Sequence, residues 1–352
     1  MSGIRLKNHT IGPGHPLFFI AEAGVNHNGD LGMALRLVDI AADAGADAVK
    51  FQTFRAESLI TRTAPKAPYH TETTGSDEEQ SWFDLLKTQE LTPAMHEAII
   101  DRCKAREILF LSTPYDNESV DLLDELDVAL FKVASTDANN IPFLEYLASK
   151  GRPIILSTAM CTLDEVIAST NAIRDAGVDD LLIMQCTGSY PAPIAEANLR
   201  AMKTIAETCQ TAIGYSDHTP GNEAAIAATA MGACAYEKHF TLDRTLPGPD
   251  HRASLEPDEL AALVATVRRT EAALGDGVKQ VMPCEVINRG RLRKTLLASR
   301  DIPAGTVLKP DDVQIKRAGG LGISPDRYHD TIGRITNKAL AKGAPIYLED
   351  VE

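Results

Sequence analysis

The chain contains two segments of the same design, Thr211-Ala-Ile-Gly-Tyr-Ser-Asp-His218 and Ala233-Cys-Ala-Tyr-Glu-Lys-His239. Each begins with a small apolar run that predicts a buried strand. Each then ends in a histidine that follows charged or hydroxyl side chains. Buried strands that end in polar residues are typical of α/β folds, in which one end of a parallel sheet carries the functional groups. Both segments therefore indicate that fold class.

The two histidines, His218 and His239, are candidate ligands for one metal ion. Neutral imidazole is a common side-chain ligand of transition metals, and two imidazoles at the ends of consecutive strands can reach the same ion. The alternative is that each histidine only caps its strand or satisfies a hydrogen bond in the core. Their equivalent positions favour the metal site. Their neighbours add charge and hydroxyl groups: Ser216, Asp217, Glu237 and Lys238.

Strand-like and helix-like patterns alternate along most of the chain. One helical pattern begins at Asp30, a good N-cap residue, and ends at Gly45. Another begins with a capping box at Thr162 and Glu165, and a longer amphipathic one follows Pro257. Apolar runs between the helices predict eight strands, at 18–23, 48–53, 108–113, 129–135, 153–158, 181–187, 212–216 and 234–240.

Eight strand–helix units predict a parallel (β/α)8 TIM barrel over residues 1–275. An open doubly wound sheet is the alternative, but no GxGxxG motif follows the first strand. The longest interruption runs from Arg55 to Leu91. A lid or a binding loop is expected there, because long connections without structure are uncommon inside a domain.

The pattern changes after Gly275. A charged connector is expected over residues 276–293, followed by a small, mainly β domain over residues 294–352. This tail contains an internal repeat, in which Ile302-Pro-Ala-Gly-Thr-Val-Leu308 and Leu340-Ala-Lys-Gly-Ala-Pro-Ile346 lead to similar acidic segments at the same spacing. Glycine in a tight turn between short alternating runs favours such a β unit.

The composition is that of an ordinary globular protein. The 352 residues are 44% hydrophobic and 24% charged, which allows a large core and more than one domain. A net charge of −14 argues against nucleic acid as a partner, because phosphate binding needs a basic surface. No apolar run predicts a membrane span or a signal peptide. The six cysteines lack CxxC pairing, so reduced thiols and a cytoplasmic location are expected.

Polar side chains end several other predicted strands. Glu22 ends the first strand, where it could act on a substrate or form a structural ion pair. Lys50 and Lys132 lie between apolar neighbours, where a lysine is costly to bury without a partner. Hydroxyl groups at neighbouring strand ends complete a candidate cradle for phosphate, although any one of them alone is more often a helix cap. These hydroxyl groups belong to Thr113, Ser135, Ser157 and Ser216.

Two proline-rich loops add further candidates. Tyr190 lies in Cys186-Thr-Gly-Ser-Tyr-Pro-Ala-Pro193, where the prolines would hold its ring rigidly. Asp250 follows Leu246-Pro-Gly-Pro249, which places a carboxylate on a stiff loop after the eighth strand.

Together these segments resemble the sialic acid synthase family, whose enzymes condense phosphoenolpyruvate with an N-acylated hexosamine to make nine-carbon 2-keto acids. The resemblance covers essentially the whole chain, and the tail is similar to the family's antifreeze-like (SAF) domain. The motifs that support it are AEAGVNHNGD, VKFQT, LSTP, FKVAS, ILSTAM, QCTGSYPAP, GYSDHT, EKHFT, GPDH and KRAGGLGIS.

The resemblance implies a role for each candidate residue. His218 and His239 would hold a divalent metal, Mn²⁺ in the first place, with Mg²⁺ or Co²⁺ as alternatives, and Glu22 would join them in catalysis. Arg317 would reach from the tail into the barrel of the other subunit of a domain-swapped homodimer and meet the N-acyl group. Contacts to phosphoenolpyruvate would come from Lys50, Thr113, Lys132, Ser135, Ser157 and Ser216. Contacts to the sugar or its reacting oxygen would come from Glu22, Gln52, Tyr190 and Asp250.

The sequence departs from the family pattern at two positions. Gly188 stands where some members place an asparagine side chain near the phosphate, so backbone or water would have to serve there. Gln185 stands where other members have a histidine beside the Cys-Thr pair.

The expected reaction joins phosphoenolpyruvate to N-acetylmannosamine or to 2,4-diacetamido-2,4,6-trideoxymannose. The product would be N-acetylneuraminate or N,N'-diacetyllegionaminate, with release of phosphate. Pseudaminate synthesis is the alternative within the family. Two alternatives outside it stay open: a lysine aldolase that forms a Schiff base at Lys132, and a non-catalytic glycan-binding protein.

Overall fold

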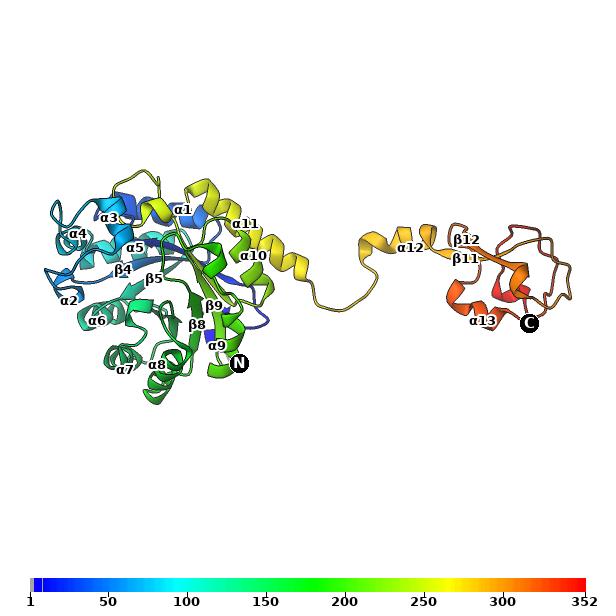
Figure 1. The fold of residues 1–352 in the computed structure, drawn as a ribbon, viewed down its shortest axis with the longest axis horizontal. Helices are drawn as coiled ribbons and strands as arrows, with labels where there is room; N and C mark the ends of the chain where they lie inside the picture. The colour runs from blue at the N-terminus through cyan, green and yellow to red at the C-terminus, as the bar shows by residue number, and fades with distance from the viewer. Residues whose placement is uncertain (1–2, 8) are drawn as a thin grey trace. The chain divides into compact units, whose positions relative to one another are not determined.

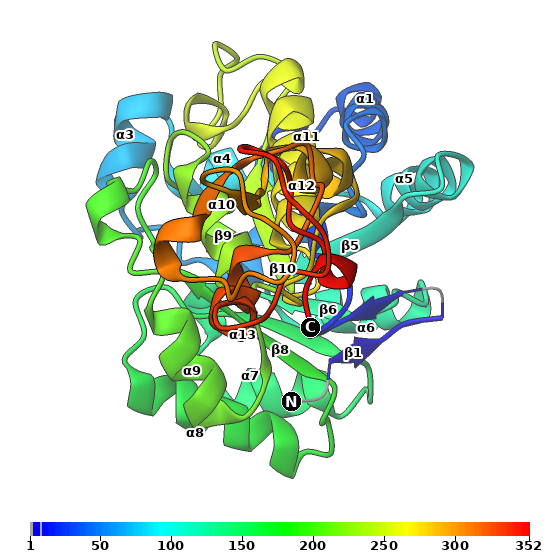
Figure 2. The same cartoon turned by 90° about the vertical axis from the view of Figure 1, so that its right-hand side faces the viewer.

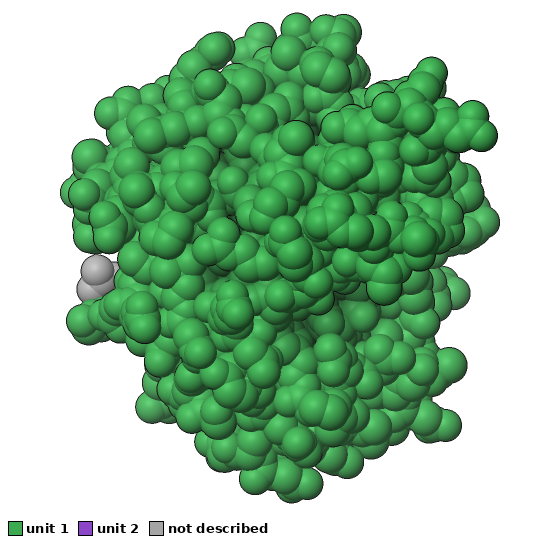
Figure 3. Space-filling model, turned by 90° about the vertical axis from the view of Figure 1, so that its left-hand side faces the viewer, with its two compact units in different colours: residues 1–275 green, residues 276–352 purple. Residues whose placement is uncertain are grey.

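The structure is a computed structural model that describes residues 3–7 and 9–352. The chain divides into two compact units, Met1–Gly275 and Asp276–Glu352 (Figure 1). Figure 3 shows one face of the first unit as a continuous surface of packed side chains. Among the described residues, no helix is both long and apolar enough to cross a membrane.

Eight strands form the centre of the first unit: β3 (Phe18–Gly24), β4 (Ala48–Thr53), β5 (Leu109–Pro114), β6 (Phe131–Val133), β7 (Ile154–Ser157), β8 (Leu181–Cys186), β9 (Ala212–Asp217) and β10 (Ala235–His239). Their hydrogen-bonded order is β5-β4-β3-β10-β9-β8-β7-β6, and each ladder is parallel. β5 and β6, at the two ends of that order, contact each other and close the sheet (Figure 2). The predicted (β/α)8 barrel is therefore confirmed.

The barrel helices surround the strands (Figure 1): α1 (Leu31–Asp43), α5 (Pro93–Ala105), α6 (Asn117–Glu125), α7 (Ile141–Ala148), α8 (Leu163–Asp175), α9 (Ala201–Cys209), α10 (Glu223–Ala230) and α11 (Pro257–Leu274). Asp30 caps α1 as expected, because its side chain accepts a hydrogen bond from the Met33 backbone N–H. The capping box of Thr162 and Glu165 is present at the start of α8. Local capping thus sets where these helices begin.

A short hairpin closes the end of the barrel where the strands begin. Its strands are β1 (Ile4–Arg5) and β2 (Thr10–Ile11), which pair antiparallel. Ile4 and Ile11 are fully buried and belong to the apolar cluster that fills the barrel interior. Two-residue strands have no hydrophobic period, so the sequence pattern does not reveal this hairpin.

The predicted connection between the second and third barrel strands contains three short helices, α2 (Ala56–Leu59), α3 (Pro68–Thr74) and α4 (Trp82–Thr88). They have a small core of their own, in which Phe83 and Leu86 pack with Phe54 and Val25. The Thr73 hydroxyl donates a hydrogen bond to the Pro249 carbonyl at 3.4 Å. This segment is therefore folded and contacts the loop that carries Asp250, and its action as a lid stays a prediction.

The second unit contains α12 (Val286–Leu292), β11 (Lys294–Ala298), β12 (Val313–Arg317) and α13 (Tyr328–Thr331), with β11 antiparallel to β12. The internal repeat is also structural, because Ile302 and Leu340 exchange two backbone hydrogen bonds of 2.8 Å. Gly305 and Gly343 both adopt a positive φ, at 76° and 85°. A small, mainly β tail is the result. α12 lies in the segment for which only a connector is expected.

Candidate active site

The interior side chains of the barrel change from apolar to polar along each strand. Alternate residues of a strand face the same side, so an interior position recurs every second residue. On β3 the interior residue Ile20 is followed two positions later by Glu22. In the same way Leu130, just before β6, is followed two positions later by Lys132. The polar positions converge at the carboxyl ends of the strands, which is the usual place of the active site in this fold.

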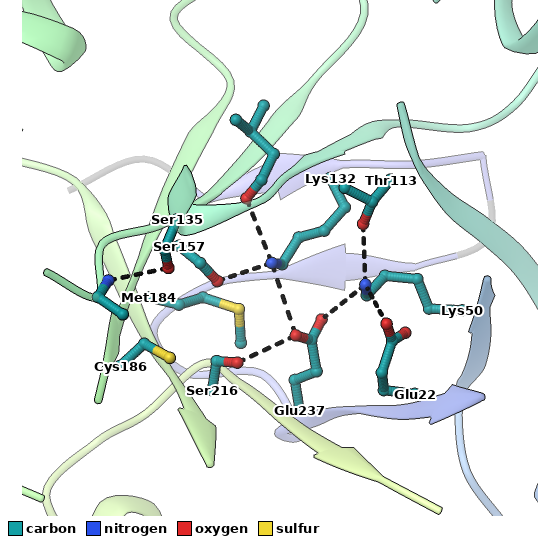
Figure 4. A network of polar contacts seen from close by, with 12 residues as sticks. Glu22, Lys50, Thr113, Lys132, Ser135, Ser157, Met184, Cys186, Ser216 and Glu237 are labelled. Atoms are coloured by element: carbon teal, nitrogen blue, oxygen red, sulfur yellow. Dashed lines mark hydrogen bonds and ion pairs between the residues drawn. The ribbon is translucent and has the colours of Figure 1, made fainter. Parts of the chain in front are cut away.

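The first part of the site is an ion pair between Glu22 and Lys50. Their side chains lie 2.9 Å apart and are almost completely buried (Figure 4). Lys50 Nζ also donates a hydrogen bond to the Thr113 hydroxyl at 2.8 Å. Burial would lower the pKa of Lys50, but the Glu22 and Glu237 carboxylates outweigh it and raise the pKa above its ordinary value. Lys50 is therefore a permanent positive charge at neutral pH.

The second part of the site surrounds Lys132. Its Nζ donates a hydrogen bond to the Ser157 hydroxyl at 2.7 Å and lies 3.6 Å from Glu237 Oε1 (Figure 4). Ser135 Oγ, on the neighbouring loop, accepts a hydrogen bond from the Ala159 backbone N–H at 2.9 Å. Two lysines and three hydroxyl groups from β4, β5, β6 and β7 are thus brought together as predicted from their strand-end positions.

Glu237 joins the two parts of the site. Its Oε2 lies 3.8 Å from Lys50 Nζ, its Oε1 lies 3.6 Å from Lys132 Nζ, and the Ser216 hydroxyl donates to Oε1 at 3.0 Å (Figure 4). Burial would raise the pKa of Glu237, but Lys132 and Lys50 outweigh it and lower the pKa to about 2. Glu237 is therefore a fixed negative charge shared by both lysines.

Sequence reasoning gave Glu237 no contact with substrate and treated it only as one of the charged neighbours that could support the two histidines. The signal that could have found it is the count of charges: two lysines predicted to be buried need a buried anion, and one carboxylate at Glu22 is not enough for both. Tyr115, at the end of β5, was also missed. Burial raises the pKa of its phenol well above the usual range, and the carboxylates of Glu22, Asp137 and Asp250 raise it further.

Three of the expected sugar contacts surround Gly24. A Cβ at this position would lie 3.4 Å from Glu22 Oε1, 3.5 Å from Gln52 Nε2 and 3.6 Å from Asp250 Oδ2. The φ of 53° at this position lies in the left-handed region that favours glycine. Burial raises the pKa of Asp250 to about 6, although Lys50 opposes the shift. Burial likewise raises the pKa of Glu22 to about 7 against the effect of Lys50.

His218 and His239 lie side by side at the ends of β9 and β10. Their ring centroids are 5.5 Å apart, and the Tyr190 ring lies 4.0 Å from His218 and 5.6 Å from His239. Burial lowers the pKa of His218 to about 4 and holds that of His239 well below its usual range. Both imidazoles are therefore neutral, the form that coordinates metal ions.

The donor set fits a divalent ion in part. His218 Nδ1 lies 2.7 Å from the Thr187 carbonyl, which fixes the tautomer in which Nε2 is the free ligand atom. His239 Nδ1 is buried and has no hydrogen-bond partner among the described residues. Within that part of the chain, no group of three or more His, Cys, Asp or Glu side chains forms a metal site. Two imidazoles are therefore in place, and further ligands would have to come from substrate or water.

The two departures from the family pattern have different surroundings. A Cβ on Gly188 would lie 3.3 Å from Met160 Cγ and 3.4 Å from the Ala159 Cβ, so the Met160 side chain fills the adjoining space. Gln185 Nε2 instead donates a hydrogen bond to the Ala197 carbonyl at 3.3 Å. Gln185 therefore supports the loop after β8.

Arg317 lies on β12 of the second unit, where its side chain is exposed. It is the one expected site residue that the first unit does not contain. Its predicted contact with the barrel of another subunit requires a second copy of the chain, so this role stays a prediction.

Comparison with known proteins gives the following matches. A model of the NeuB family matches residues 37–279, and a model of the SAF domain matches residues 293–352. The N,N'-diacetyllegionaminic acid synthase of Campylobacter jejuni is 44% identical over 321 residues, which cover 91% of this chain and 95% of that protein. A protein of the same name from Legionella pneumophila is 39% identical, with coverage of 95% and 94%. A solved structure titled N-acetylneuraminic acid (sialic acid) synthetase, from Leptospira borgpetersenii, matches with a TM-score of 0.70 and 37% identity, covering 80% of this chain and 93% of that one.

Proposed function

This chain belongs to the NeuB family, and we propose that it is a nonulosonic acid synthase that condenses phosphoenolpyruvate with an N-acyl hexosamine and releases phosphate. The observation that supports this most directly is the pair of buried lysines at the mouth of the barrel, which share Glu237 and are surrounded by hydroxyl groups. The names of the two bacterial relatives favour 2,4-diacetamido-2,4,6-trideoxymannose as the hexosamine and N,N'-diacetyllegionaminate as the product.

The lysines supply the positive charge that phosphoenolpyruvate needs inside a protein of net charge −14. Lys132, with Ser157, Ser135 and Ser216 around it, offers charge-assisted hydrogen bonds to one anionic group. Lys50 and Thr113 offer them to a second. A substrate that has both a phosphate and a carboxylate would occupy both parts of the site.

Carbon–carbon bond formation joins C3 of phosphoenolpyruvate to the aldehyde carbon C1 of the open-chain sugar. Positive charge then develops at C2 of the former enol, water adds to C2, and the tetrahedral intermediate expels phosphate. The carboxylate of Glu22 stabilises the positive charge or orients the water. Asp250, partly protonated near its pKa of about 6, is a candidate to give a proton to the oxygen of the former aldehyde.

His218 and His239 would hold a divalent ion, in the first place Mn²⁺, with their neutral imidazoles. When bound, such an ion supplies Lewis acidity that makes a carbonyl carbon more electrophilic. Tyr190, beside both rings, limits the space next to them. Arg317 of a second subunit would meet the N-acyl group in a domain-swapped homodimer.

The proposal is tested by measuring phosphate release from phosphoenolpyruvate with a panel of N-acyl hexosamines, with and without Mn²⁺. We expect release only when a sugar is present, together with a 2-keto acid product in equal amount. A lysine aldolase would instead be trapped by borohydride in the presence of pyruvate, at Lys132. A glycan-binding protein would bind sugars without phosphate release, and either result would overturn the proposal.

The metal assignment has its own test. We expect His218→Ala to reduce turnover by at least about a thousandfold, because one of the two imidazoles that hold the ion is lost. EDTA should inhibit the parent protein, and added Mn²⁺ should restore it. Near-normal turnover of the parent in chelated buffer would remove the ion from the mechanism and leave the condensation itself standing.

A further inference from the structure

A buried ion pair lies directly behind the two histidines. Asp217 precedes His218 on β9, Lys238 precedes His239 on β10, and the two residues are partners in the parallel ladder. Lys238 Nζ lies 2.8 Å from Asp217 Oδ2, and both side chains are almost completely buried. Because side chains alternate along a strand, this pair faces the helices and not the barrel interior. It therefore lies outside the site that would bind substrate.

The pair belongs to a network that spans both histidine positions. Asp217 Oδ1 accepts hydrogen bonds from the Thr219 backbone N–H at 2.8 Å and from the Thr219 hydroxyl at 2.7 Å. The Tyr236 hydroxyl donates to Asp217 Oδ2, and Lys238 Nζ donates to the Thr219 carbonyl. The residues before and after His218 are thus tied to the residue before His239.

Stability alone does not account for two buried charges at this place. A buried ion pair is often no more stable than two apolar residues of the same size, because both charges lose their hydration. What the network does supply is a fixed relation between two strand ends. Lys238 Nζ donates hydrogen bonds to the Asp217 carboxylate and to the Thr219 carbonyl, so it holds the backbone on both sides of His218.

The two histidines also differ in how they are held. His218 has a hydrogen bond to the Thr187 carbonyl, whereas His239 Nδ1 has no hydrogen-bond partner among the described residues. The ring of His239 is therefore positioned by its backbone and by packing against His218 and Tyr190. The ion pair of Asp217 and Lys238 joins the two strands one residue before each ring.

We propose that Asp217 and Lys238 are positioning residues that set the spacing of His218 and His239 for one divalent ion. This inference rests on the metal assignment made above. It predicts that loss of the ion pair weakens metal binding even where the fold is kept, because the two imidazoles no longer approach one ion in the right geometry.

The experiment measures Mn²⁺ affinity of the purified full-length protein by electron paramagnetic resonance titration, with the melting temperature of each variant. Lys238→Met removes the cation that faces Asp217 and leaves a buried carboxylate without a counter-ion, and we expect at least a tenfold weaker affinity. The double variant Asp217→Asn with Lys238→Met removes both charges at nearly constant volume. We expect the double variant to have a higher melting temperature than Lys238→Met but no higher Mn²⁺ affinity. If Lys238→Met does not fold, the double variant is measured in its place.

Arg268→Met is the control variant. Arg268 pairs with Asp47 at 2.6 Å where the strands begin, so its loss breaks an ion pair of the barrel far from the histidines. We expect it to leave Mn²⁺ affinity within twofold of the parent. Affinity within twofold of the parent in Lys238→Met, or affinity that recovers together with stability in the double variant, would overturn the inference. A parent protein that binds no Mn²⁺ would overturn both this inference and the metal assignment. The proposed condensation would not be affected, because the phosphate-release assay tests it separately.

Discussion

The two ends of the barrel interior are built on the same strands with opposite chemistry. Where the strands begin, Ile4 and Ile11 of the hairpin close an apolar cluster, and the ion pair of Asp47 and Arg268 is only partly buried. Where they end, the interior contains two lysines and two carboxylates that are almost completely buried. The apolar end stabilises the fold. The charged end contains buried charges whose loss of hydration costs free energy, and a bound ligand can compensate for that cost.

Among the variants that compare the two ends, the largest effect on activity is expected at Lys132. Lys132→Met should lower kcat/KM for phosphoenolpyruvate about a thousandfold, which is about 4 kcal/mol, because a buried charge that meets the substrate is lost. Steady-state phosphate release measures it. Arg268→Met, which removes a cation at the other end, should change kcat/KM by less than about threefold. Equal losses in both variants would show that the two ends do not differ in the way described.

A smaller effect, with a change of pH profile, is expected at Glu22. Its pKa is raised to about 7, so it is protonated below pH 7 and a carboxylate above it. Because the proposed role needs the negative charge, kcat/KM should rise as the pH increases through about 7. Glu22→Gln should lower kcat about a hundredfold and abolish this rise.

Asp250→Asn is the control for that profile, since the pKa of Asp250 is raised only to about 6. We expect the rise through pH 7 to persist in this variant. A rise that survives in Glu22→Gln would assign it to another group.

At the apolar end the expected effect is on stability. Ile4→Ala removes a fully buried side chain from the cluster beneath the site and should cost about 2–4 kcal/mol of unfolding free energy. Urea denaturation measures the cost. The values of kcat and KM at 25 °C should stay within about twofold of the parent, and a large loss of kcat would contradict the separation of the two ends.

Most of the fold follows from local patterns. Apolar runs predicted all eight barrel strands within a few residues, because each is buried on both faces. Asp30 and Thr162 cap their helices as expected, since capping depends only on neighbouring residues. The helices within 56–88 were not predicted, because they are short and their apolar residues face a small separate core.

The site also contains residues that local sequence reveals and residues that it does not. Lys50 and Lys132 were recognisable because a lysine within an apolar run is unusual. The importance of Glu237 depends on the ladder that places it beside Ser216, and on lysines from two other strands. Those relations between distant residues are set by barrel closure, and no spacing along the sequence reports them. The pairing of Asp217 with Lys238 depends on the same register.

Glu237 also determines how the pocket responds to salt. An anion that arrives at two unpaired lysines releases small ions from solution, which makes affinity fall steeply with ionic strength. Here the counter-ion of Lys50 and Lys132 is the Glu237 carboxylate of the protein itself, so entry of phosphoenolpyruvate releases few small ions to solution. We therefore expect KM for phosphoenolpyruvate to change by less than about threefold between 50 and 300 mM KCl, as steady-state kinetics would check. The buried carboxylate would thus make substrate capture by this protein depend little on the salt concentration.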